Sequence, residues 1–241
     1  LRLPKVAEKL GRPPVMACTA TATPQVAAEI AERMGMREPA EIHSGFDRPN
    51  LSFDTIALEG KGSKARKQAL LERLGYMKDG KLLPRGEIAR ELHTQELLVT
   101  ELIFSGVFHE FTEDQIAALA VCIDYEPRRG EFPAKSVPFD VDRIREIAAQ
   151  VEMVEESYVG TSAVRFFTGL APLAYRWSQG AEFADMLRGS AYAEGDVVSA
   201  FRRSIDLLRQ VRAACKADAA LADKISDVMR RIDRDVVEVV L

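Results

Sequence analysis

From residue 140 to the end of the chain, apolar residues recur every three to four positions, and a few turn-forming residues interrupt them. This period places the apolar side chains of a helix on one face. The breaks fall at Gly160, Gly180, Gly189 and Asp218. They divide the segment into predicted helices over residues 140–157, 161–177, 181–188, 196–216 and 220–239. The pattern therefore predicts a mainly α fold, a helical bundle, for the larger part of the chain.

A tight hairpin and short helices are predicted just before this segment. Asp79-Gly80 is a two-residue turn between apolar pairs, which strongly favours a β-hairpin. Pro84 then opens a helix to His93, so that hairpin and helix together look like the tail of a winged helix. Two more helices are predicted over residues 94–104 and 112–124, the second headed by a capping box of Thr112 and Gln115.

The first 58 residues follow a different pattern. A first helix is predicted over residues 1–10, and a near-continuous apolar and β-branched run at residues 15–21 indicates a buried strand. A helix over residues 25–34 follows, and further strands are predicted near residues 41–43 and 53–56. This order is typical of an α/β sheet, of which only a few strands are predicted here. We therefore expect this part to be marginally stable alone, or to dock onto the rest.

The amino-acid composition excludes some classes of protein but does not identify a function. The 241 residues are 47% hydrophobic and 29% charged, as in an ordinary globular protein, and no apolar run approaches the ~18 residues of a membrane span. A net charge of −4 argues against a nucleic-acid binder held by bulk charge, although a local basic stripe on an acidic body can also grip phosphates. The three cysteines and three histidines lack ligand spacing, which argues against a metal site and fits a reducing, cytoplasmic setting without a leader peptide.

Two motifs near the start of the chain carry a first resemblance. Residues 16–24 read Met-Ala-Cys-Thr-Ala-Thr-Ala-Thr-Pro, and residues 45–51 read Gly-Phe-Asp-Arg-Pro-Asn-Leu. At this spacing they resemble the end of the first RecA-like motor domain of a RecQ-like superfamily 2 helicase. The resemblance implies that Thr19, Ala20 and Thr21 occupy the place of motif III, which couples the nucleotide site to the nucleic-acid path. The alternative is an ordinary strand, turn and well-capped helix.

The sequence lacks the parts of a motor that hold nucleotide. Neither a Gly-x4-Gly-Lys-Ser/Thr phosphate loop nor a magnesium-holding acidic box occurs in these residues. We therefore expect no catalytic residue and no cofactor in this chain, with ATP and Mg²⁺ bound only by an intact parent protein. A working ATPase whose phosphate loop comes from another chain is a rival that no sequence feature supports.

A second and longer resemblance covers about residues 75–241. The matching segments are residues 74–89, 96–108, 113–119, 175–180 and 194–203, in the same order as in the family. They resemble the DSHCT domain of exosome-associated DExH-box RNA helicases of the Ski and Mtr type. In such helicases a second motor domain precedes the winged helix, so a seam is expected between residues 60 and 75.

These resemblances give a predicted domain plan. Residues 1–58 would be a remnant of the first RecA-like domain, and the polar, glycine-rich residues 59–73 a linker or seam. Residues 74–130 would hold a winged-helix remnant and the first DSHCT helices. Residues 131–241 would form the helical bundle, including the predicted helix at 196–216.

That predicted helix carries the candidate site. Its apolar arc comprises Val198, Phe201, Ile205, Leu208 and Val211, with Leu207 at the edge. The opposite face carries Arg202, Arg203, Asp206, Arg209 and Gln210, with Ser199 beside them. In the family the corresponding "ratchet" helix lies along the exiting single strand, and Arg203 and Asp206 match its contacting residues. The alternative is a solvated face with weak ion pairs. Two positions depart from the family pattern, which usually has a basic residue where Ser199 stands and a Leu-Glu pair where Ser204-Ile205 stands.

Other candidates are weaker. Arg128-Arg129 is interpreted as solubilising loop charge, Trp177 and Tyr175 as core aromatics, and the arginines of the last helix, Arg230, Arg231 and Arg234, as interhelical or dipole partners.

The function predicted is that of a non-catalytic, nucleic-acid-contacting C-terminal part of an ATP-dependent superfamily 2 helicase. Its expected partners are single-stranded RNA or DNA, together with the motor domains or a nuclease complex, and no membrane. The alternative is a helical protein–protein interaction module that touches no nucleic acid.

Overall fold

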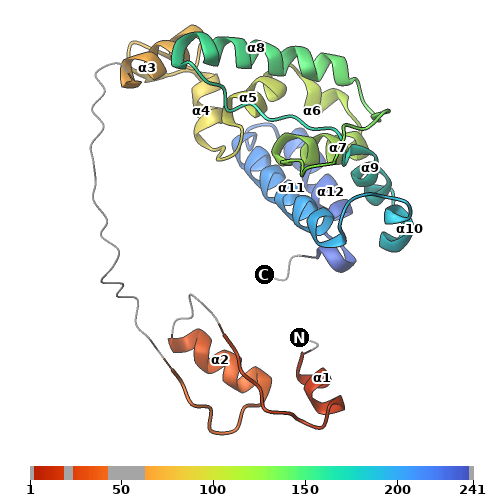
Figure 1. The fold of residues 1–241 in the computed structure, drawn as a ribbon. Helices are drawn as coiled ribbons and strands as arrows, with labels where there is room; N and C mark the ends of the chain where they lie inside the picture. The colour runs from red at the N-terminus through yellow and green to blue at the C-terminus, as the bar shows by residue number, and fades with distance from the viewer. Residues whose placement is uncertain (1–2, 19–23, 43–62, 239–241) are drawn as a thin grey trace. The chain divides into compact units, whose positions relative to one another are not determined.

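The computed structural model describes residues 3–18, 24–42 and 63–238. The chain divides into two compact units, Leu1–Ala57 and Leu58–Leu241, which are treated separately below (Figure 1). In the part that is described, no helix combines the length and apolar character needed to cross a membrane.

The first unit contains two helices among its described residues, α1 (Leu3–Lys9) and α2 (Pro24–Met34), which contact one another. Both helices are confirmed predictions, and α2 ends at Gly35 with a positive φ of 62°. The strand predictions differ, because residues 15–18 and 41–42 lie outside helices and strands. Met16 is 87% and Ile42 91% exposed, so neither side chain is covered by a sheet within the described residues. The remaining predicted strand positions, including Thr19, Ala20 and Thr21, lie outside the described residues.

The second unit is almost entirely helical, which confirms the prediction of a mainly α bundle (Figure 1). Its first part comprises α3 (Ser63–Arg73), the hairpin of β1 (Met77–Lys78) and β2 (Lys81–Leu82), α4 (Pro84–Arg90), α5 (Glu96–Phe104) and α6 (Val107–Glu110). Its second part comprises α7 (Glu113–Asp124), α8 (Val141–Val159), α9 (Ala171–Ser178), α10 (Phe183–Leu187), α11 (Glu194–Ala214), α12 (Ala219–Ile232) and the 3₁₀ turn η1 (Asp235–Val237). The predicted hairpin is confirmed, with Met77 paired to Leu82 and Lys78 to Lys81.

Several segments of the second unit differ from the sequence prediction. The helix predicted at 220–239 ends at Ile232 in α12, and residues 235–237 form the separate 3₁₀ turn η1. Residues 63–73, assigned to a linker, form α3, which packs against α8 and carries the buried Leu70. Residues 161–170, assigned to a helix, lie outside helices and strands. Pro172 explains the last case, because a proline is tolerated in the first turn of a helix but would clash with the preceding turn in its interior. At Gly169 a Cβ would lie 2.0 Å from the Tyr192 hydroxyl, so this segment also needs a residue without a side chain.

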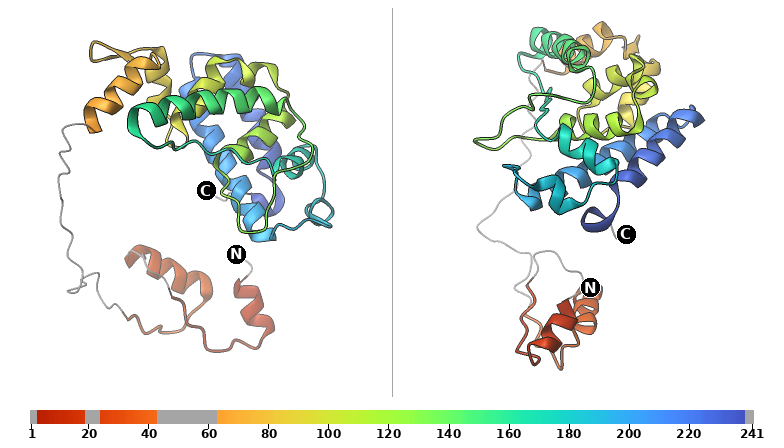
Figure 2. Two further views of the ribbon diagram at one scale, coloured as in Figure 1. Left: turned by 45° about the horizontal axis from the view of Figure 1, so that its top comes forward. Right: turned by 90° about the vertical axis from the view of Figure 1, so that its right-hand side faces the viewer.

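Helix α7 forms the centre of the second unit. Its residues from Ile116 to Ile123 are all buried, and it contacts α9, α11 and α12. A helix that is apolar all round must be enclosed, and the alanines at 117, 118 and 120 let neighbouring backbones approach closely. Its predicted capping box is confirmed by the bonds between Thr112 and Gln115. Helices α11 and α12 lie side by side in all views (Figure 2).

Helix α12 begins at a charged cap that also joins it to α6. Asp218 accepts a bond from the backbone N–H of Leu221 at 3.0 Å, and its second oxygen lies 2.7 Å from His109 Nε2. The backbone bond from Leu221, followed by the contact with His109, lowers the pKa of Asp218 below its ordinary value. The ionised carboxylate therefore stabilises the start of α12.

We predict that substituting Ala118 with leucine destabilises the second unit by about 1–3 kcal/mol, because the enclosed α7 leaves no room for added methylenes. Urea denaturation measures the change. Ala149→Leu serves as the matched control, since Ala149 is exposed on α8 and its substitution should change the stability by less than about 0.5 kcal/mol. Equal effects of the two substitutions would contradict the central place of α7.

We also predict a pH effect from the α12 cap. A lowered folded-state pKa gives stability that is present above the unfolded value of ~3.9 and is lost as the pH falls through the folded value. Asp218→Asn keeps a side chain that can cap but removes the titration. Urea midpoints of wild type and variant should therefore converge as the pH falls from about 5 to below 3. A stability difference that does not change with pH would show that Asp218 contributes no titrating charge.

Candidate nucleic-acid interface

Helix α11 presents one face to the core and one to solvent. Phe201, Ile205, Leu208 and Val211 are buried as predicted, together with Leu207. Val198 was predicted to start the buried face but is only partly buried. Its neighbour Val197 is buried instead, so the buried face starts one residue earlier. The helix begins at Glu194, two residues before the predicted start, and Glu194 and Asp196 lie in its first turn, where carboxylates favour a helix N-terminus.

Arg202 serves the fold and is engaged within the protein. Its guanidinium donates to the backbone carbonyls of Val237 at 3.1 Å, Val236 at 3.2 Å and Glu238 at 3.3 Å. These bonds tie α11 to the turn η1 across 34–36 residues of sequence. Sequence spacing placed Arg202 on the candidate face, but the structure directs it to the carbonyl groups at the end of the chain.

Arg203 and Ser199 meet at a cleft beside α11. Arg203 Nε lies 3.3 Å from Asp124 Oδ2 at the end of α7, and the Arg203 side chain is 47% exposed. The cleft has a volume of about 360 Å³. It is lined by Asp124, Tyr125, Glu126, Arg128, Arg165, Asp196, Ser199 and Arg203.

Asp206 continues the exposed stripe from Arg203, one helical turn further along α11. Its Oδ2 accepts a bond from Gln210 Nε2 at 3.0 Å, and Gln210 Oε1 accepts the backbone N–H of His93 at 2.7 Å. Arg209 is half-buried on the same helix. Of the five predicted residues, the structure thus brings Ser199 and Arg203 together at the cleft and leaves Asp206 exposed on the adjacent turn.

Of the eight residues that line the cleft, sequence reasoning had predicted only Ser199 and Arg203 as site residues, and it missed the two further arginines, Arg128 and Arg165. Arg128 lies in the loop after α7 and was interpreted as solubilising charge, while Arg165 fell inside a predicted helix. The structure places both beside Arg203, although the three are far apart in the sequence. No local pattern could reveal this, because the grouping depends on how three separate segments pack.

Tyr125 forms a neutral and fixed part of the wall of the cleft. Tyr125 is 4% exposed, and its hydroxyl donates to Glu131 at 2.8 Å. Burial, with a smaller effect of that bond to Glu131, raises the pKa of Tyr125 well above its ordinary value. The ring therefore stays uncharged, and the chemistry of the cleft is that of its arginines and carboxylates. Among the described residues, no group of histidine, cysteine and carboxylate side chains could hold a metal ion.

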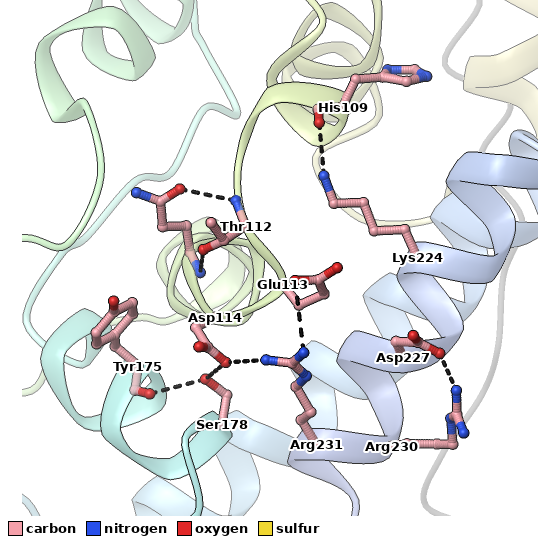
Figure 3. Close-up of polar contacts among 11 residues, drawn as sticks. His109, Thr112, Glu113, Asp114, Tyr175, Ser178, Lys224, Asp227, Arg230 and Arg231 are labelled. Atoms are coloured by element: carbon pink, nitrogen blue, oxygen red, sulfur yellow. Dashed lines mark hydrogen bonds and ion pairs between the residues drawn. The ribbon is translucent and has the colours of Figure 1, made fainter.

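A separate polar network holds the last helix to the bundle. Figure 3 shows Arg231 reaching from α12 to Asp114 and Glu113 at the start of α7, with an Arg231 Nη1 to Asp114 Oδ1 distance of 2.7 Å. Asp114 also accepts a bond from Ser178 of α9, and Lys224 donates to the carbonyl of His109 (Figure 3). The interpretation of Arg231 as an interhelical partner is therefore confirmed.

The aromatic residue of this region belongs to the core. Trp177 is fully buried, and its indole N–H donates to the carbonyl of Ile232 at 2.9 Å. Arg234 lies over the indole ring, 3.5 Å from the ring centre, and donates to the carbonyls of Trp177 and Ala181. Trp177 is therefore a packing residue, as predicted, and is not exposed to stack on a base.

Comparison with known proteins shows the family to which this chain belongs. The family model described as the DSHCT (NUC185) domain matches residues 79–240, which include all of α11 and the cleft. Similar curated proteins include Exosome RNA helicase MTR4 of Homo sapiens, 30% identical over 189 residues, and ATP-dependent RNA helicase mtr4 of Schizosaccharomyces pombe, 31% identical over 206 residues. The aligned regions cover 72% and 75% of this chain, and 18% of each relative.

A more distant relative covers more of the chain. Superkiller complex protein 2 of Homo sapiens is 24% identical over 218 residues, which is 86% of this chain and 17% of that protein. The chain thus spans under a fifth of the length of the curated relatives that it matches.

We predict that Arg202→Ala lowers the free energy of unfolding by about 1–2 kcal/mol, because it leaves three carbonyl groups near the chain end without their charged donor. Arg203→Ala is the matched comparison on the neighbouring position and should cost less than about 1 kcal/mol, since its ion pair is half-exposed. Chemical denaturation of both variants measures the difference. A larger loss at Arg203 than at Arg202 would reverse this division of roles.

Proposed function

Because the chain belongs to the DSHCT family of helicase C-terminal domains, we propose that it contacts single-stranded RNA as the non-catalytic C-terminal part of a DExH-box RNA helicase. The observation that carries the proposal is the exposed polar stripe of Ser199, Arg203 and Asp206 on α11, beside an open cleft. In this proposal the bundle holds the strand while motor domains of the parent protein supply the movement.

The chemistry of the stripe suits a single strand. Arg203 offers a planar fork of donors that fits phosphate oxygens, and its ion pair with Asp124 is half-exposed and hence weak enough to exchange. Asp206 can accept from a ribose 2′-hydroxyl or from a base edge, which are the groups through which proteins read single-stranded RNA. RNA is favoured over DNA because the relatives named above are described as RNA helicases.

The proposal extends to the first unit through its sequence motifs. We infer that residues 1–58 derive from a RecQ-like first motor domain, in which Thr19, Ala20 and Thr21 would couple the nucleotide site to the strand. ATP and Mg²⁺ would bind in the intact parent and not in this chain. The exposed apolar residues of this unit, Met16 and Ile42 among them, fit a fragment whose sheet lies elsewhere.

A pure protein-interaction module is the competing function. Its best support is the exposure of Phe132, at 76%, and Met153, at 68%. These residues lie on different elements, the loop after α7 and helix α8. Single exposed apolar residues are ordinary on protein surfaces, so they support a docking site less well than the α11 stripe supports a strand.

Fluorescence anisotropy with a labelled single-stranded RNA, and with its DNA counterpart, tests the proposal at several salt concentrations. We predict affinity for RNA that falls with salt by a slope of about 0.7 for each phosphate contacted. Absence of binding at low salt would contradict the proposed function and favour the protein-interaction alternative.

Substitutions on α11 make the test specific. We predict that Arg203→Ala and Asp206→Ala each weaken RNA binding by about three- to tenfold. The Asp206 result is the sharper one, because removing a negative charge should strengthen binding if only bulk charge mattered. Arg230→Ala, at an exposed ion pair on α12, is the control and should change affinity by less than about twofold. Unchanged affinity in both α11 variants would exclude the stripe.

A further inference from the structure

Three arginines from three separate segments converge on the cleft beside α11. Arg128 comes from the loop after α7, Arg165 from the irregular segment before α9, and Arg203 from α11 itself. Their side chains are 69%, 51% and 47% exposed, so each guanidinium can change partner without unpacking the core.

Each of these arginines is paired with a carboxylate of the same cleft. Arg128 pairs with Asp196, Arg165 lies 3.3 Å from Glu126, and Arg203 lies 3.3 Å from Asp124. Three positive and three negative groups leave the cleft without net formal charge. An exposed ion pair contributes only about 0–1 kcal/mol, so a better anionic partner can displace the carboxylates.

The backbone that presents the two outer arginines is anchored. The backbone N–H of Arg165 donates to Gln95 Oε1 at 2.9 Å, and that of Phe167 donates to the carbonyl of Cys122 at 2.9 Å. On the other side, the backbone N–H of Arg128 donates to Glu131 Oε2 at 2.8 Å, the same oxygen that accepts from Tyr125. The segments are therefore held in place while the guanidinium groups reach into an open space. Fixed backbones with exposed donors lower the ordering cost of binding.

We propose that this cleft is a phosphate-binding site for the single strand, in which Arg128, Arg165 and Arg203 exchange their carboxylate partners for phosphate oxygens. The proposal rests on the proposed function and deepens it, because it adds two residues outside α11 and a competing set of carboxylates. A volume of about 360 Å³ lies at the lower end of the ~300–1,000 Å³ typical of small-ligand sites, which suits a phosphate with part of its sugar. Guanidinium forks bind phosphate oxygens bidentately, and the Ser199 hydroxyl at the same cleft adds a further donor.

The carboxylates then act as internal competitors for the strand. Asp124, Glu126 and Asp196 hold the arginines when no strand is present and must be displaced when one enters. This exchange makes each phosphate contact weak and reversible, as a strand that has to move through the site requires. It also gives the proposal a distinctive signature, because removing a competitor should strengthen binding.

The pair Arg165–Glu126 provides the test, since neither residue lies on α11. In the anisotropy assay with single-stranded RNA and the full chain, we expect Arg165→Ala to weaken binding about three- to tenfold and to lower the salt slope by about 0.7. Glu126→Gln should strengthen binding about two- to fivefold, because it frees Arg165. In the double variant this gain should disappear, because there is no arginine left to free.

A matched control separates this effect from bulk charge. Asp227→Asn removes one negative charge from an exposed ion pair with Arg230 on α12 and should change affinity by less than about 1.5-fold. If Glu126→Gln has no more effect than Asp227→Asn, or if its gain persists in the absence of Arg165, the cleft is not the phosphate site. The α11 stripe would then stand alone as the proposed interface.

If the wild-type chain binds no single strand, the proposed function fails. A second probe then tests separately whether the cleft binds phosphate. Inorganic pyrophosphate is titrated while the arginine side-chain Nε–Hε signals are followed by NMR. Saturable shifts of the Arg128, Arg165 and Arg203 signals, lost for the remaining two in Arg165→Ala, would support a phosphate site. Unchanged signals would overturn it.

Discussion

The second unit depends on the complete enclosure of helix α7. Eight consecutive residues of this helix are buried, and helices α9, α11 and α12 pack around it. Apolar burial is the dominant favourable term in folding, so the positions of these helices follow from the need to cover α7. The same packing sets the site, because the C-terminal end of α7 delivers Asp124 and Tyr125 to the exposed face of α11. A packed core thereby fixes the geometry of a polar surface.

The arginines of this bundle have two distinct roles, and even two arginines adjacent in the sequence can differ in role. Arg202 and Arg234 donate to backbone carbonyls of the turn η1 and of the segment that ends α9, and so tie distant parts of the bundle together. Arg203 and Arg165 pair with half-exposed or exposed carboxylates and keep their donors near solvent. Buried or multiply bonded guanidinium groups stabilise a fold, whereas exposed and singly paired ones can serve a ligand. The bonding partner and the exposure of each guanidinium group therefore distinguish a structural arginine from one that can bind a ligand, whereas its charge does not.

Local patterns predicted most of the helical structure. The spacing of Phe201, Ile205 and Leu208 identified the buried face of α11, and the capping box at Thr112 and the turn at Asp79-Gly80 were confirmed. The failures arose where tertiary contacts decide. Residues 63–73 form a helix against α8, and residues 161–170 lie outside helices and strands, with backbone N–H groups bonded to Cys122 and Gln95. For the same reason, sequence could place Ser199 and Arg203 on one helix face but could not predict that Arg165 joins them.

We propose that the exposed face of α11 and the adjoining cleft lie along a single strand of RNA. Photo-crosslinking of a uridine-containing single strand to the full chain, followed by mass-spectrometric mapping of the attached peptides, tests it without any substitution. We expect crosslinks concentrated in α11 and in the segments that carry Arg128 and Arg165. Crosslinks confined to the exposed face of α8, with none on α11, would contradict it.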